Sequence, residues 1–186
     1  MPNMNYNKKL TDTSVRVGEV MFSYAYVFEP RANMSGEPKY SCSILIDKSN
    51  TAAVNLIEEA IDAATEQGKH AKWGGKIPKN VRSPLRDGDE ERDDPAYEGK
   101  YFLNASASTK AKPAVKVLEN GQLVDALDGE DFYSGCFGVA VLNFYPYAAS
   151  GNNGVGCGLN VVAKTRDGER LSGGMSAESA LAGLYD

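Results

Sequence analysis

Residues 14–28 read SVRVGEVMFSYAYVF, and this stretch decides the fold class. It is rich in β-branched and aromatic residues, which favour strands, and it is long for a single strand. Gly18 provides a position for a bend or a bulge. Beyond it one face carries every second residue, because side chains alternate along a strand: Val20, Phe22, Tyr24, Tyr26 and Phe28. The stretch predicts one long, bent β-strand with Phe22 and Phe28 in the core.

Most of the remaining chain alternates between strand patterns and turn residues. Tight turns are expected at Asn120–Gly121 and Asp167–Gly168, and a short last strand is expected after the second turn. The predicted strands after the first cover residues 39–47, 99–108, 113–118, 122–127, 136–147 and 155–164.

One segment has the period of a helix. Apolar residues recur every three or four positions over residues 51–67, and Gly68 is expected to end this helix. Residues 69–98 then contain repeated glycines and prolines and predict one extended loop. A loop of that length in a compact domain usually has a function.

This order of elements predicts a mainly β protein. The fold that we expect is an OB-fold-like Greek-key barrel with one long inserted helix and a long basic and acidic loop, although a β-sandwich fits the same elements. We divide the chain into a flexible N-terminus over residues 1–13, one barrel domain over residues 14–174 and a short C-terminal tail or helix over residues 175–186.

The composition excludes several classes of protein. With 42% hydrophobic and 24% charged residues, the chain is neither disordered nor a membrane protein. It contains no apolar run near the roughly 18 residues that span a bilayer, and residues 1–9 lack the apolar region of a signal peptide, so a cytosolic protein is expected. Three widely spaced cysteines favour neither disulfides nor a zinc site.

The sequence contains no motif that marks a catalytic centre. His70 is the only histidine, and the acidic run at residues 87–94 has Arg92 where a calcium loop requires glycine. We therefore predict no enzyme activity, no catalytic residue, no metal site and no cofactor. A metal-dependent nuclease that uses these acids ranks last among the alternatives.

The net charge of −5 hides a strongly uneven distribution. Residues 69–86 carry six Lys or Arg and no acid, residues 87–98 carry seven acids and one arginine, and residues 100–118 carry four lysines and no acid. Two basic stretches therefore flank an acidic one, and an anionic chain can still present a basic surface to nucleic acid.

Aromatic residues are interleaved with these basic stretches. Binding of single-stranded nucleic acid needs cations for the phosphates and flat rings on which bases stack, and this chain contains both. The candidate DNA-binding residues are Tyr24, Tyr26, Tyr40, Trp73, Lys76, Lys79, Arg82, Arg86, Tyr101, Phe102, Lys110, Lys112, Phe144, Tyr145, Tyr147 and Lys164.

Three blocks of sequence, in this order and spacing, resemble a known family. They are VGEV (17–20) through FEP (28–30) with KYS (39–41); PLRDGD (84–89) with YEGKYFLNA (97–105) and KP (112–113); and YSGC (133–136), NFYPY (143–147) and GNNGVGCGLN (151–160) with DGE (167–169). The chain resembles the phage-encoded single-stranded DNA-binding proteins of the OB-fold class, a family long catalogued as conserved phage proteins of unknown function.

The resemblance implies a barrel that coats and protects single-stranded DNA, with little sequence preference, during phage DNA replication or recombination in the cytoplasm of the host cell. It places the DNA in a groove flanked chiefly by Tyr101, Phe102, Lys112, Phe144, Tyr145 and Tyr147. It implies single-stranded DNA and replication or recombination proteins as partners, no membrane, and leaves oligomerisation open. The alternative is a non-catalytic phage protein-interaction or assembly module.

The chain departs from many replication-type single-strand binders at its end. Such proteins carry a strongly acidic tail, whereas residues 179–186 contain one acidic side chain. Recruitment of other proteins through a tail is therefore in doubt. The charge of residues 87–98 suggests instead that this loop screens the basic groove against weak ligands.

Overall fold

The structure is a computed structural model that describes residues 5–32, 36–149 and 151–171. The C-terminal tail or helix expected at residues 175–186 lies outside these ranges. The strands are β1 (Lys8–Lys9), β2 (Ser14–Ala32), β3 (Pro38–Asp47), β4 (Val81–Arg82), β5 (Arg86–Asp87), β6 (Lys100–Ser108), β7 (Ala114–Glu119), β8 (Gln122–Asp125), β9 (Phe137–Ala149) and β10 (Asn152–Arg166), and the helices are α1 (Thr51–Ala71), α2 (Gly88–Glu91) and the 3₁₀ helix η1 (Pro95–Tyr97).

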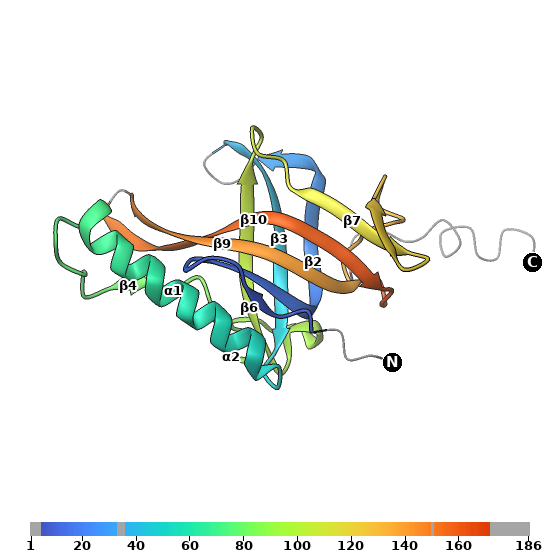
Figure 1. Cartoon of the computed structure of the whole chain (residues 1–186), viewed down its shortest axis with the longest axis horizontal. Helices are drawn as coiled ribbons and strands as arrows, with labels where there is room; N and C mark the ends of the chain where they lie inside the picture. Colours follow the sequence, from blue (N-terminus) through green and yellow to red (C-terminus); the bar gives the residue numbers. More distant parts are fainter. Residues whose placement is uncertain (1–4, 33–35, 150, 172–186) are drawn as a thin grey trace, which may run out of the picture.

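Five of the strands close into a barrel. The hydrogen-bonded order runs β6-β3-β2-β9-β10, and β10 returns to β6 where Gly158 pairs with Ser106. β9 and β10 are long and cross the whole molecule (Figure 1). Beyond the barrel, β7 pairs in parallel with β10, and β8 pairs with β7. The prediction of a mainly β, OB-fold-like barrel with one long helix is confirmed.

The bend predicted at Gly18 is present as a shift in the pairing of β2 with β9 between Gly18 and Val20. A Cβ at Gly18 would lie 2.6 Å from the Cβ of Tyr6, so the glycine lets the N-terminal segment approach. β1 pairs with β2, and the Arg16 side chain donates a 2.9 Å hydrogen bond to the Tyr6 carbonyl. Part of the segment expected to be flexible is thus held against the barrel.

The helix α1 buries one side against the barrel. Its buried residues are Ala53, Val54, Ile57, Ala60, Ile61, Ala64 and Gly68, spaced as the sequence predicts. Asn50 caps the first turn, since its side chain accepts a 3.3 Å hydrogen bond from the Ala53 N–H. None of the helices in the described ranges is long and apolar enough to cross a membrane.

The structure differs from three sequence-based expectations. α1 continues past Gly68 to Ala71. A Cβ at Gly68 would lie 2.6 Å from both Pro146 and the Trp73 ring, so this glycine lets these two residues pack against the helix and does not end it. The loop 69–98 contains four short elements, β4, β5, α2 and η1. No strand forms between residues 167 and 171, where the described part of the chain ends.

Candidate nucleic-acid interface

The outward side of β3 and β6 is polar in its middle. The pairing of the two strands sets Ser43 opposite Asn104 and Ser41 opposite Ser106. The Ser43 hydroxyl donates a 2.6 Å hydrogen bond to Oδ1 of Asn104. These short side chains make a shallow surface that can donate and accept hydrogen bonds.

The neighbouring ribbon of β9 and β10 adds aromatic rings to this surface. Three glycines of β10 face side chains of β9, in the pairs Gly154–Tyr147, Gly156–Tyr145 and Gly158–Asn143. A Cβ at Gly156 would lie 2.5 Å from the Tyr145 ring, and one at Gly154 would lie 2.6 Å from the Tyr147 hydroxyl. The glycines therefore let both rings lie across β10. Tyr145 remains 41% exposed to solvent.

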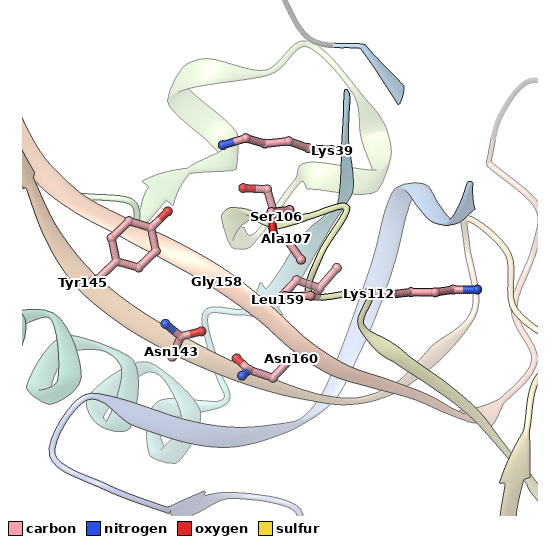
Figure 2. Close-up of a pocket in the computed structure, with 11 residues that line it drawn as sticks. Lys39, Ser106, Ala107, Lys112, Asn143, Tyr145, Gly158, Leu159 and Asn160 are labelled. Carbon is pink, nitrogen blue, oxygen red and sulfur yellow. The ribbon is translucent and has the colours of Figure 1, made fainter. Parts of the chain in front are cut away.

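A hollow lies where this ribbon meets the end of β6 (Figure 2). Asn143, Tyr145 and Ser106 line it, together with Lys39 and Lys112. Figure 2 shows the Lys39 side chain extending on the Tyr145 side of the hollow, whereas Nζ of Lys112 points away from the tyrosine. The hollow thus combines an exposed ring, amide and hydroxyl groups, and a cation.

Two further hollows continue this surface, and Asn104 lines both of them. One lies over Ser41 and Ser43 and also contacts Tyr24, Tyr26, Arg31 and Arg92. The other lies over Gly156 and Cys157 and also contacts Tyr147, Arg82, Arg86 and Glu91. We call the three hollows together the groove. Its cations are Arg31, Lys39, Arg82, Arg86, Arg92 and Lys112.

Two groove tyrosines come from an irregular part of β2. The pairing with β3 shifts between Ser23 and Tyr26, and Tyr24 has a left-handed backbone with φ of 47°. A tyrosine rarely adopts this conformation, which is typical of strained functional positions. The next residue, Ala25, donates its N–H to the Ser134 hydroxyl at 3.1 Å, which holds the bulge. The result is a Tyr24 side chain that is 44% exposed.

Seven predicted binding residues line the groove. They are Tyr24, Tyr26, Arg82, Arg86, Lys112, Tyr145 and Tyr147. Tyr26 is covered on one side by Arg31, whose guanidinium carbon lies 4.6 Å from the ring centroid.

Three predicted stacking rings are instead buried. Phe102 and Phe144 are 0% and 2% exposed, and Tyr40 is 9% exposed. Phe144 alternates with Tyr145 along β9 and so points into the core. Phe102 lies on the outward side of β6 but is covered: Tyr97 packs against its edge at 5.2 Å, and the guanidinium carbons of Arg86 and Arg92 lie 5.6 and 5.1 Å from its centroid. The Phe102 ring therefore packs against the guanidinium groups of Arg86 and Arg92 and is too buried to stack on a DNA base.

Tyr101 and Lys164 do not line the groove. Tyr101 has the opposite parity to Asn104 on β6, and it lines a hollow with acidic residues on α1 and α2. Lys164 lies eight residues along β10 from Gly156, or about 26 Å. Its Nζ is 2.7 Å from the Asp167 carboxylate. The structure thus places neither side chain in the lining of the groove, and Tyr101 lines a hollow that adjoins it at Arg86 and Glu91.

The remaining candidates belong to loops beside the groove. Trp73 is half-buried, and its indole N–H donates a 3.3 Å hydrogen bond to the Tyr147 carbonyl, so it supports β9 from α1. Lys76, Lys79 and Lys110 are exposed but do not line the groove.

Sequence reasoning missed several groove residues. The cations Arg31, Lys39 and Arg92 lie singly among other residue types, outside any basic run. The polar residues Asn104 and Ser106 were detectable, because every second residue of β6 from Asn104 to Ser108 is polar, as on a solvated strand face.

The three cysteine thiols are buried, and the carboxylates of Asp87 and Asp89 are paired with Lys48. Burial raises the pKa of Cys136 to about 11 and raises the pKa values of Cys42 and Cys157 further, so all three are neutral. Hydrogen bonds from Lys48 lower the pKa values of Asp87 and Asp89. Within the described ranges, His, Cys, Asp and Glu form no group of three able to hold a metal ion.

A closed five-stranded barrel with exposed rings and cations along one outward groove defines a nucleic-acid-binding protein of the OB-fold type. Residues 13–185 match the family described as Enterobacter phage Enc34 ssDNA-binding protein, and the chain belongs to this family. The family predicted from the sequence blocks is therefore confirmed. No curated protein matches the chain.

Solved structures agree with this family. The chain resembles the single-stranded DNA-binding protein of bacteriophage Enc34 in complex with ssDNA, with 24% identity and a TM-score of 0.73 over 92% of this chain and 100% of that one. A C-terminal truncation of the Enc34 protein gives 26% identity and a TM-score of 0.72 over 88% and 95%. The gp2.5 single-stranded DNA-binding protein of bacteriophage T7 shares the fold at 14% identity, with a TM-score of 0.56 over 88% and 97%.

Proposed function

We propose that this protein binds single-stranded DNA along the groove, with little sequence preference, and coats it during phage DNA replication or recombination. The observation that carries the proposal is that four tyrosines, of which Tyr24 and Tyr145 are exposed, line the groove together with six cations. A ring can stack on any base, and a cation can neutralise any phosphate, so this pairing binds the strand without reading its sequence. A relative of similar fold has been solved with ssDNA bound.

The proposed role is binding without catalysis in the cytoplasm of the infected host cell. Contacts with replication or recombination proteins, and assembly of several copies along one strand, stay predictions.

A titration with fluorescent oligonucleotides tests the proposal. Oligo-dT and a mixed-sequence strand are expected to bind with similar affinity, and log affinity is expected to fall linearly with log salt between about 50 and 200 mM. Tyr145→Ala is expected to weaken binding of the single strand and to leave any binding of a duplex unchanged, because the duplex keeps its bases stacked inside. An absence of single-strand binding at low salt, or an affinity indifferent to salt, would overturn the proposal.

One surface favours the alternative of a protein-interaction module. Beyond the groove, on β7 to β10, apolar side chains line a separate hollow: Leu118, Leu123, Val139, Val141 and Val161. This alternative predicts that oligo-dT shows no salt-sensitive binding and that Tyr145→Ala behaves like the wild type in the oligonucleotide titration.

A further inference from the structure

One arginine of the groove, Arg86, is already paired with an acid of the same chain. Nε of Arg86 donates a 2.8 Å hydrogen bond to Oε1 of Glu91, and the NH2 group donates to the same oxygen. Both residues line the hollow over Gly156 and Tyr147. A carboxylate therefore occupies the donors that a DNA phosphate would take, since both anions bind the guanidinium fork.

The loop that carries Glu91 is fixed in place by its own contacts. Nζ of Lys48 lies 2.8 Å from both the Asp87 and the Asp89 carboxylate, and the other oxygen of Asp89 accepts a 2.9 Å hydrogen bond from the Gly99 N–H. Gly88 is buried, and a Cβ there would lie 2.4 Å from the Tyr97 carbonyl. These contacts fix α2, and α2 in turn holds the Glu91 carboxylate against the Arg86 guanidinium.

Arg86 has a second support that does not depend on Glu91. Its guanidinium carbon lies 5.6 Å from the centroid of the buried Phe102 ring, which Arg92 and Tyr97 also contact. The arginine can therefore keep its place when its anionic partner changes. The two side chains are 47% and 35% exposed, and an ion pair with that access to water is weak enough to be exchanged.

We propose that Glu91 is a built-in counter-ion of Arg86 that a DNA phosphate replaces when the strand binds. This inference rests on the proposed function and adds to it a regulation of the same site. A single phosphate gains too little binding free energy at Arg86 to displace the Glu91 carboxylate, which belongs to the same chain and is always close to the arginine. A strand held at once by neighbouring rings and cations displaces it, and Glu91 returns to Arg86 when the strand leaves. The groove thereby favours polymers over single nucleotides and releases them readily.

Removal of the charge of Glu91 tests the exchange. Glu91→Gln is expected to bind oligo-dT about two- to fivefold more tightly than the wild type, the range that a surface ion pair implies. Glu90→Gln makes the same chemical change one residue away. Glu90 lines the acidic hollow beside the groove, which Arg86 and Glu91 also line, but Arg86 donates its hydrogen bonds to Glu91, so Glu90→Gln is expected to give a clearly smaller gain. Unchanged far-UV circular dichroism and melting temperature show that the variants fold.

The same change in an Arg86→Gln background identifies the partner. Arg86→Gln alone is expected to weaken binding, and Glu91→Gln added to it is expected to change affinity no further. Equal gains from Glu91→Gln and Glu90→Gln, or a full gain without Arg86, would show a general charge effect and overturn the inference. If the wild type binds oligo-dT with the expected salt dependence and Glu91→Gln does not bind more tightly, only this inference fails. If neither protein binds at low salt, the proposed function fails with it.

Discussion

Replacement of Tyr145 by alanine separates stacking from charge in the groove. The Tyr145 ring lies across Gly156 with its exposed side toward the hollow of Figure 2, so it offers one face to a base. Stacking of one base on an aromatic ring contributes about 1–3 kcal/mol. Tyr145→Ala is therefore expected to raise the dissociation constant for oligo-dT about 5- to 140-fold.

The assay is fluorescence anisotropy of labelled oligo-dT at several salt concentrations. Because Tyr145 carries no charge, the alanine variant is expected to keep the wild-type slope of log affinity against log salt and to lose affinity equally at every concentration. Tyr145→Phe is the matched control: it keeps the ring and removes the hydroxyl, and it is expected to bind within about twofold of the wild type if stacking dominates.

Two results would refute this reasoning. A folded alanine variant with wild-type affinity would remove Tyr145 from the DNA path. A phenylalanine variant as weak as the alanine variant would show that the hydroxyl, and not the ring, makes the contact.

Four more changes are expected to have measurable effects. Gly156→Ala places a Cβ 2.5 Å from the Tyr145 ring, which must lift, so oligo-dT binding should weaken while far-UV circular dichroism stays normal; unchanged affinity would contradict this. Arg82→Gln should flatten the salt slope by about 0.7, the value for one phosphate on a single strand, and a parallel line would exclude the contact. Gly68→Ala should lower the melting temperature, because its Cβ would lie 2.6 Å from Pro146 and Trp73 and such overpacking costs about 1–3 kcal/mol; an equal or higher melting temperature would refute it. Lys48 lowers the pKa values of Asp87 and Asp89 in the folded state, so its stabilising effect should be present above the ordinary carboxyl pKa and be lost as pH falls through the lowered values. Denaturant titrations should then show the wild type losing its advantage over Lys48→Gln in acid, and a gap that is constant with pH would argue against it.

The sequence predicted the strands and the long helix well because their signals are local. The helical period of α1 survives in the structure. The alternation predicted along β2 holds at Val20 and Phe22, but the bulge between Ser23 and Tyr26 shifts it, so Val27 is buried while Phe28, predicted for the core, is half-buried. Gly68 misled because a glycine near the end of a helical pattern resembles a stop signal, and only the approach of Pro146 and Trp73 reveals its packing role.

The groove was harder to predict because it depends on which side of a strand stays uncovered. Alternation alone separates Phe144 from Tyr145, but it cannot say that η1 covers Phe102 and leaves Asn104 open on the same side of β6. Arg31 and Lys39 are isolated in the sequence, and only the pairing of β2 with β3 brings them near the tyrosines. When strand pairing brings basic residues together, the sequence contains no basic run that would predict the cluster.

The three glycines that face Asn143, Tyr145 and Tyr147 imply a conflict between robustness and activity. Glycine is among the poorest strand formers, so β-branched residues would strengthen β10 itself once the three facing side chains had moved aside for them. Their side chains would also occupy the space over β10 in which the Tyr145 and Tyr147 rings lie. Selection of random variants for heat resistance alone should therefore yield barrels with a higher melting temperature that no longer bind single-stranded DNA.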